Sequence, residues 1–124
     1  MTGYKVEIKE VSAQLTAKQR IALKDTTNAI KLDLETQKSP VIINPDFYAV
    51  LAIHNEKSDN PDYENYIVVD KSGDKYVTGS QSFWNSFMEI AEEMAGEDEE
   101  WSVKVYRVES KNYKGKEFIT CSIE

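Results

Sequence analysis

The chain has 124 residues, of which 40% are hydrophobic and 30% are charged, and this balance excludes wholesale disorder. The formal net charge is -7, and the single cysteine, Cys121, excludes an internal disulfide and a cysteine-based zinc site. No stretch approaches the length of about twenty apolar residues that a membrane span needs, and no signal peptide is evident. We therefore expect one soluble cytoplasmic domain without membrane contact.

The first forty residues predict a strand followed by a helix. Alternating apolar side chains favour a strand over residues 4–11. In "LTAKQRIALKD", Thr16 is the expected helix N-cap, and Ile21 and Leu23 are the expected apolar anchors. The next segment, "NAIKLDLETQKSP", is ambiguous, because its alternating apolar residues also allow a strand, which Pro40 would end.

The middle of the chain predicts three strands. "VIINPDFYAVLAIHN", residues 41–55, is expected as one long bent strand in which Pro45 interrupts the hydrogen-bond ladder at an edge or a bulge. After the polar loop "EKSDNPD", the segments "YENYIVVD" and "KYVTG" predict two strands. They are joined by "KSGD", a tight hairpin turn in which Gly73 can take a positive φ.

The clearest predicted element is a helix in "SQSFWNSFMEIAEEMAG". Ser80 or Thr78 is its expected N-cap, and Gly96 can close its end. Apolar residues at helical spacing form one stripe, and Trp84 lies beside it. The stripe consists of Phe83, Phe87, Ile90, Ala91 and Met94.

Two final strands follow, each with a period of two. In the first of them, Trp101, Val103 and Val105 share one face, and Lys104, Tyr106 and Val108 share the other. After the turn "SKNYKGK", Ile119, Cys121 and Ile123 share one face, and Lys116, Phe118 and Thr120 point the opposite way. This phase makes Cys121 a small core residue rather than a reactive thiol.

From residue 41 onward the expected order is three strands, a helix and two strands. This is the order of an OB-fold, a five-stranded, partly open Greek-key barrel. We therefore predict a mainly β fold, with an OB-fold-like barrel over residues 41–124 and a strand-helix extension over residues 1–40 packed on it. An α+β sandwich with the same element order is the alternative, because order alone does not determine strand pairing.

The charges are strongly segregated along the chain. Residues 104–118 contain five basic and two acidic side chains, a local sum of +3. Residues 89–100 contain seven acidic side chains and no basic one. Because the local field decides whether a polyanion binds, the net acidity does not exclude a nucleic-acid ligand.

Single-stranded nucleic acid is bound by a basic track together with aromatic rings on which the bases stack. In OB-folds the ligand lies on the second and third strands and against two loops, here "EKSDNPD" and "SKNYKGK". The predicted phosphate contacts are Lys71, Lys75, Lys104, Arg107, Lys111, Lys114 and Lys116. The predicted stacking rings are Tyr66, Tyr76, Tyr106, Tyr113 and Phe118, and for each tyrosine the alternative is a half-buried ring with its hydroxyl in solvent.

Two runs, "VVDKSGDKYVTGSQSFWNSFMEI" and "SVKVYRVESKNYKGKEFITCSIE", resemble the small single-stranded DNA-binding proteins of tailed phages, including protein-primed phages. The resemblance covers about the last sixty residues well and the first forty poorly. It implies an OB-fold that coats single-stranded DNA without sequence specificity during phage replication or recombination, in the cytoplasm of the host. The site residues that it carries over are Tyr76, Lys111, Lys114, Lys116 and Phe118.

Other functions are weighed against this one. An enzyme is not indicated, because the only histidine, His54, is more typical of a strand end than of a general base, and no phosphate loop, HExxH pair or GxSxG elbow is present. We expect no catalytic residue, cofactor or metal. The main alternative is an acidic protein-binding module, such as a phage inhibitor or DNA mimic acting on a host protein, and a bare structural domain is a second one. The acidic residues 89–100 are also a candidate contact for replication or recombination proteins, and the oligomeric state is left open.

Overall fold

The computed structural model describes residues 3–57, 59–110 and 115–124. The protein is a strand-rich α/β protein, with 44% strand and 22% helix, in which the strands form two open sheets. It divides into two compact units. The first consists of Met1–Ile30 and Asp46–Gly79, and the second of Lys31–Pro45 and Ser80–Glu124. These divisions differ from the single boundary after residue 40 that the sequence suggested.

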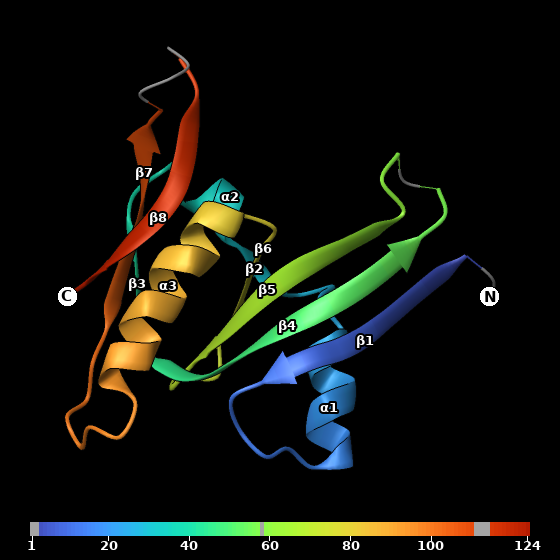
Figure 1. Cartoon of the computed structure of the whole chain (residues 1–124), viewed down its shortest axis with the longest axis horizontal. Coiled ribbons are helices and arrows are strands. Elements are labelled where there is room, and N and C mark those ends of the chain that lie inside the picture. Colours follow the sequence, from blue (N-terminus) through green and yellow to red (C-terminus); the bar gives the residue numbers. More distant parts are fainter. Residues whose placement is uncertain (1–2, 58, 111–114) are drawn as a thin grey trace. The chain divides into compact units, whose positions relative to one another are not determined.

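The sheet of the first unit has five strands in the order β1-β4-β5-β6-β2 (Figure 1). β1 pairs antiparallel with β4, with a register shift between Ile8 and Glu10, and it forms one edge of the sheet. The predicted strand over residues 4–11 is confirmed. The strands are β1 (Tyr4–Val11), β2 (Ile30–Lys31), β4 (Pro45–Asn55), β5 (Asp62–Asp70) and β6 (Lys75–Thr78).

Helix α1 (Ala17–Lys24) contributes to the core of this unit. Thr16 caps the helix as predicted, and its hydroxyl accepts a hydrogen bond from the Gln19 backbone N–H at 3.2 Å. Leu23 is 2% exposed and packs against Leu51 and other apolar residues of β4, β5 and β6. Ile21, the other expected anchor, is 68% exposed. That expectation was wrong because two residues separated by two positions on a helix do not face the same side.

The hairpin between β5 and β6 forms as predicted. The Asp70 backbone N–H donates to the Asp74 carbonyl at 2.8 Å, and the Gly73 N–H donates to the Asp70 carbonyl at the same distance. Gly73 has a φ of 98°, which a glycine adopts without the steric cost that a Cβ would bring. Local turn chemistry was therefore sufficient to place this connection.

The second unit contains a three-stranded antiparallel sheet in the order β3-β7-β8, with helix α3 alongside β8 (Figure 1). Its elements are α2 (Leu32–Glu35), β3 (Val41–Ile43), α3 (Gln81–Met94), β7 (Val103–Glu109) and β8 (Glu117–Ile123). The Ser82 hydroxyl donates to the Ile119 carbonyl at 2.8 Å, and the Ser86 and Thr120 hydroxyls lie 2.8 Å apart. These bonds tie α3 to β8.

Helix α3 confirms the helix that was predicted from the most strongly periodic part of the sequence. The Ser80 hydroxyl caps it by accepting from the Phe83 N–H at 3.2 Å. Phe83 and Phe87 are fully buried, and their rings stack with centroids 5.7 Å apart. Even this helix has only 14 residues, and none of the described helices is long and apolar enough to cross a membrane.

The described strands form no closed barrel, so the predicted OB-fold-like barrel is corrected to two open sheets. The single strand expected over residues 41–55 is divided at Pro45 into β3 and β4, which belong to different sheets. Proline has no N–H to donate to a ladder, so the strand is interrupted there. β3 then pairs with β7, and the last two strands complete a sheet with β3 rather than with β4, β5 and β6.

The ambiguous segment before Pro40 forms a two-residue strand and a single helical turn. Leu32 at the start of α2 is fully buried, whereas Leu34 is 55% exposed. The strand that their alternation allowed is therefore present only in β2, because the chain turns into α2 directly after Lys31.

Candidate functional site

One face of the β7–β8 hairpin combines exposed apolar, aromatic and basic side chains. Directly opposite residues of an antiparallel pair point to the same side of a sheet. The register therefore places three cross-strand pairs together, and Ile42 of β3 lies opposite Lys104 on the same side. The pairs of this outer face are Lys104 with Ser122, Tyr106 with Thr120, and Val108 with Phe118.

The opposite, inner face belongs to the core of the second unit. It contains the buried residues Val103, Val105, Ile119 and Cys121. Burial raises the pKa of the Cys121 thiol to about 12, which keeps it protonated and unreactive near neutral pH. The predicted phase of both strands and the core position of Cys121 are confirmed.

The outer face leaves large apolar groups in solvent. Phe118 is 40% exposed and Ile42 is 46% exposed. Tyr106 is half-buried, and its hydroxyl lies 2.7 Å from the Ser122 hydroxyl, which holds the ring in place. Phe118 is two residues before Thr120, the partner of Tyr106, so Phe118 and Tyr106 occupy diagonal positions on this face, and the Tyr106 hydroxyl reaches in the other direction, to Ser122. Accessible aromatic and apolar groups on one face of a hairpin favour a ligand with flat apolar parts.

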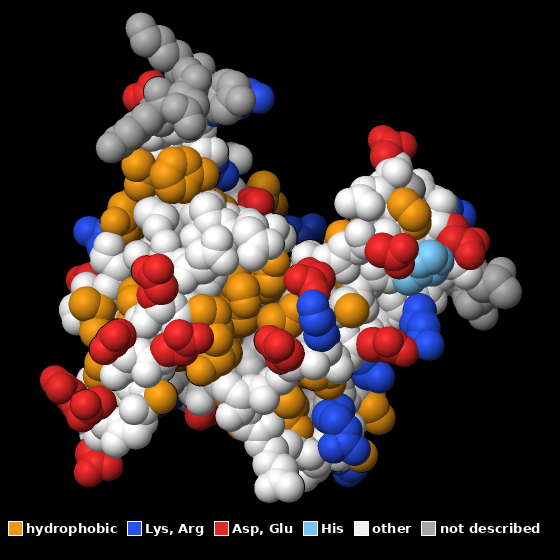
Figure 2. Space-filling model, viewed as in Figure 1, with side chains coloured by type: hydrophobic (Ala, Val, Ile, Leu, Met, Phe, Trp, Pro, Cys, Tyr) orange, Lys and Arg blue, Asp and Glu red, His pale blue; other side chains and the backbone are white. Residues whose placement is uncertain are grey.

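Basic side chains lie on and beside this face. Lys104 and Lys116 are exposed, and the Ser110 N–H donates to the Lys116 carbonyl at 2.8 Å, which closes the hairpin before its tip. Hydrophobic and basic side chains lie near one another over β7 and β8 in the upper left of Figure 2. The predicted contacts Lys111, Tyr113 and Lys114 lie outside the described residues.

A run of four acidic residues, 97–100, precedes β7. Residues 97–100 are exposed in the connection between α3 and β7, and acidic side chains gather there in Figure 2. Lys116 follows the opposite end of this seven-residue strand, at least about 20 Å away along β7. Since the Debye length is about 8 Å at physiological ionic strength, salt largely screens Lys116 from residues 97–100, whereas Lys104 lies at the same end of β7 as those acidic residues.

Arg107 makes a hydrogen bond within the second unit. By register it lies opposite Ile119 on the inner face, and its Nη2 donates to the Asp33 carbonyl at 2.5 Å. Its buried Nε has no hydrogen-bond partner among the described residues. The guanidinium therefore joins β7 to α2, and Arg107 is only partly exposed for the predicted phosphate contact.

The two predicted stacking rings on β5 and β6 lie inside the protein. Tyr66 is 4% exposed and Tyr76 is 9% exposed, so both rings are buried more completely than the half-buried alternative supposed. Burial is the main reason that the pKa of Tyr66 is raised. The ammonium of Lys75 donates to the carbonyls of Ala22 and Asp25, both at 2.5 Å, and so satisfies the C-terminal end of α1. Only Lys71, in the turn, is exposed.

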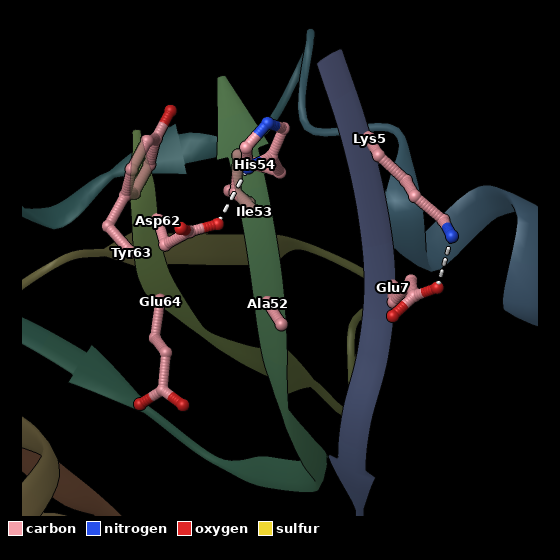
Figure 3. Close-up of a pocket in the computed structure, with 8 residues that line it drawn as sticks. All are labelled: Lys5, Glu7, Ala52, Ile53, His54, Asp62, Tyr63 and Glu64. Atoms are coloured by element: carbon pink, nitrogen blue, oxygen red, sulfur yellow. Dashed lines mark hydrogen bonds and ion pairs between the residues drawn. The ribbon is translucent and has the colours of Figure 1, made fainter. Parts of the chain in front are cut away.

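A concave region lies on the sheet of the first unit. It is a cavity of about 370 Å³ across β1, β4 and β5, in which Ala52 leaves space between longer side chains (Figure 3). The lining residues are Lys5, Glu7, Ala52, Ile53, His54, Asp62, Tyr63 and Glu64.

His54 is the titratable group of this cavity. Its Nδ1 lies 2.7 Å from Asp62 Oδ1, and its Nε2 lies 3.6 Å from Glu56 Oε1. Asp62, and to a smaller extent Glu56, raise the pKa of His54. The imidazole is 42% exposed near the end of β4, which confirms the predicted strand-end histidine.

The other charged groups around the cavity pair with one another. Lys5 Nζ lies 2.8 Å from Glu7 Oε1, and Lys9 Nζ lies 2.5 Å from Glu64 Oε2. Among the described residues, no group of three or more His, Cys, Asp and Glu side chains is arranged to hold a metal ion. The charged groups that line and border the cavity therefore take part in ion pairs at its surface.

No protein-family model, curated protein or solved structure matches the chain. The resemblance to phage single-stranded DNA-binding proteins therefore stays a prediction. The outer face also contains Ile42 and Ser122, which sequence reasoning missed because only the pairing of β3 with β7 and of β7 with β8 brings them beside Lys104.

Proposed function

We propose that this protein binds single-stranded DNA without sequence specificity and coats it during phage replication or recombination in the host cytoplasm. The observation that carries the proposal is the outer face of the β7–β8 hairpin. There Phe118 and Tyr106 occupy diagonal positions, and Lys104 lies two residues from Tyr106 on the same face. Every base has an aromatic face, so rings beside cations bind single strands with little regard to sequence.

The proposed binding is stoichiometric. Bases stack on Phe118 and Tyr106, each stack contributing about 1–3 kcal/mol, while Lys104 and Lys116 contact phosphates. Lys111, Tyr113 and Lys114 extend this surface in the proposal, on the strength of the sequence. Each phosphate neutralised on a single strand changes the slope of log K against log salt by about -0.7, so affinity falls steeply with salt.

The first test is fluorescence anisotropy of a labelled dT oligonucleotide titrated with the protein at low and at high salt. We expect saturable binding that weakens with salt and is much weaker for a matched duplex. Phe118→Ala should weaken binding, whereas Ile123→Ala should not, although Ile123 is a 52% exposed apolar residue of the same strand. An absence of binding even at low salt would refute the proposal.

A second binding test addresses the contribution of Tyr113 and Lys114. Tyr113→Ala combined with Lys114→Ala should lower DNA affinity and leave the free energy of unfolding unchanged. If both affinity and stability stay unchanged, the tip does not contribute, and the outer face alone must account for binding.

The second candidate is an acidic module that binds a host protein. It is favoured by the exposed acidic residues 97–100, which precede β7 in the connection from α3. The same titration separates the two functions, because this candidate predicts no affinity for single strands at any salt concentration. Replacing residues 97–100 with their amide counterparts would then be the next step.

A further inference from the structure

β1 forms one edge of the sheet of the first unit. It is the terminal strand in the order β1-β4-β5-β6-β2, and among the strands that the structure describes its one partner is β4 (Figure 1). Six of its eight residues are exposed, including Tyr4 at 49% and Val11 at 37%. A long edge with exposed apolar side chains is a template for pairing with another strand.

The backbone groups that point away from β4 can be identified. The Gly3 carbonyl accepts from the Glu56 N–H at 2.8 Å, and the register continues from Tyr4 opposite Asn55. In an antiparallel pair, hydrogen-bonded positions alternate with non-bonded ones. Lys5 and Glu7 therefore bond to β4, and the residues whose N–H and C=O groups face outward are Tyr4, Val6 and Ile8.

We propose that β1 pairs antiparallel with β1 of a second copy of this chain, with the two-fold axis at Val6. In this register Tyr4 lies opposite the partner's Ile8, and Val6 lies opposite the partner's Val6. All three outward-facing residues then bond across the interface. The two sheets become one continuous sheet through a self-complementary contact.

The charges on the other face of β1 select this register. It places Lys5 opposite the partner's Glu7, and symmetry repeats this opposite-charge pair on the far side of the axis. An axis at Glu7 would instead oppose Glu7 to the partner's Glu7 and Lys5 to the partner's Lys9. An axis at Ile8 would extend the pairing across the bulge between Ile8 and Glu10. Edge charges usually discourage strand pairing, but here they disfavour only the wrong registers.

The apolar face supports the same contact. Val6 and Ile8 are half-buried and pack against the core cluster of the first unit, so they remain partly accessible at its margin. In the proposed register the exposed ring of Tyr4 lies beside the partner's Ile8. The dimer therefore continues the core across the axis and covers apolar groups that are in water in the single chain.

Sedimentation velocity over a wide range of protein concentrations, without DNA, tests the pairing. We expect a monomer–dimer equilibrium for the natural chain. K5E and E7K each turn both symmetric pairs into like-charge pairs, so each should weaken self-association by at least about tenfold. The double variant K5E/E7K restores opposite charges and should dimerise like the natural chain.

Mixing the two single variants gives the most specific result. K5E presents two carboxylates and E7K presents two ammonium groups, so an equimolar mixture should form a heterodimer at concentrations at which each variant alone is mainly monomeric. Circular dichroism checks that all variants are folded, which is expected because both positions are exposed.

Two results would overturn the pairing. One is a natural chain that stays monomeric at the highest soluble concentration. The other is a dimer on which the charge variants and their mixture have no effect, since that dimer uses another surface. The inference does not depend on the proposed function, because DNA is absent from the experiment.

Discussion

The β5–β6 and β7–β8 hairpins contain similar residue types but use them differently. In β5 the consecutive residues Tyr66, Ile67 and Val68 are all buried, so both faces of that strand are covered. In β7 the pattern alternates, with Val103 and Val105 buried and Lys104 exposed between them. A tyrosine or lysine therefore becomes part of the core or part of a surface according to whether its face of the sheet is covered.

The largest expected effect concerns the buried side of this comparison. Tyr66→Ala should lower the free energy of unfolding by about 3 kcal/mol, because it leaves a cavity where a large ring was packed. Phe118→Ala should lower it by less than about 1 kcal/mol, since that ring is already 40% exposed. Urea denaturation of the two variants measures the difference, and equal losses would contradict the assigned roles.

The DNA affinity should show the reverse order. Phe118→Ala should cost about 1–3 kcal/mol of binding to a dT oligonucleotide, the contribution of one stacked base. Tyr66→Phe keeps the buried ring and should bind like the natural chain. If Tyr66→Phe weakened binding as much as Phe118→Ala, the interface would have to include β5.

The two lysines Lys75 and Lys104 provide a smaller contrast. Lys75→Ala removes the hydrogen bonds to the α1 carbonyls and should lower stability by about 1 kcal/mol without changing DNA affinity. Lys104→Ala should leave stability unchanged and reduce the salt slope of binding by about 0.7. Chemical denaturation and anisotropy titrations, carried out on both variants, check the pair.

The smallest expected effect is a pH dependence in the first unit. Asp62 and Glu56 raise the pKa of His54 above its ordinary value of 6.5, so the folded state holds this proton more tightly than the unfolded state. The resulting stabilisation is fully present below pH 6.5 and is lost as the pH rises through the folded pKa. Asp62→Asn should flatten this part of the stability–pH profile, and an unchanged profile would show that the pair does not contribute.

Much of the local structure could be predicted from the sequence, because it depends on neighbouring residues. The aromatic stripe and Ser80 cap of α3, the Gly73 turn, and the alternating phase of β7 and β8 all arise from contacts or torsions within a few residues. The phase of β7 and β8 also placed Lys104, Tyr106 and Phe118 correctly on the outer face. Of the candidate site, this is the part that the sequence alone determined.

Only the tertiary structure decided which strands pair and which faces are covered. The pairing of β3 with β7 replaced the expected barrel, the burial of Tyr66 and Tyr76 removed two expected stacking rings, and the Asp33 carbonyl engaged Arg107. The open edge of β1 was likewise visible only once the strand order was known. These features depend on contacts between residues far apart in the chain, and a pattern of period two specifies a face of a strand without specifying what that face meets.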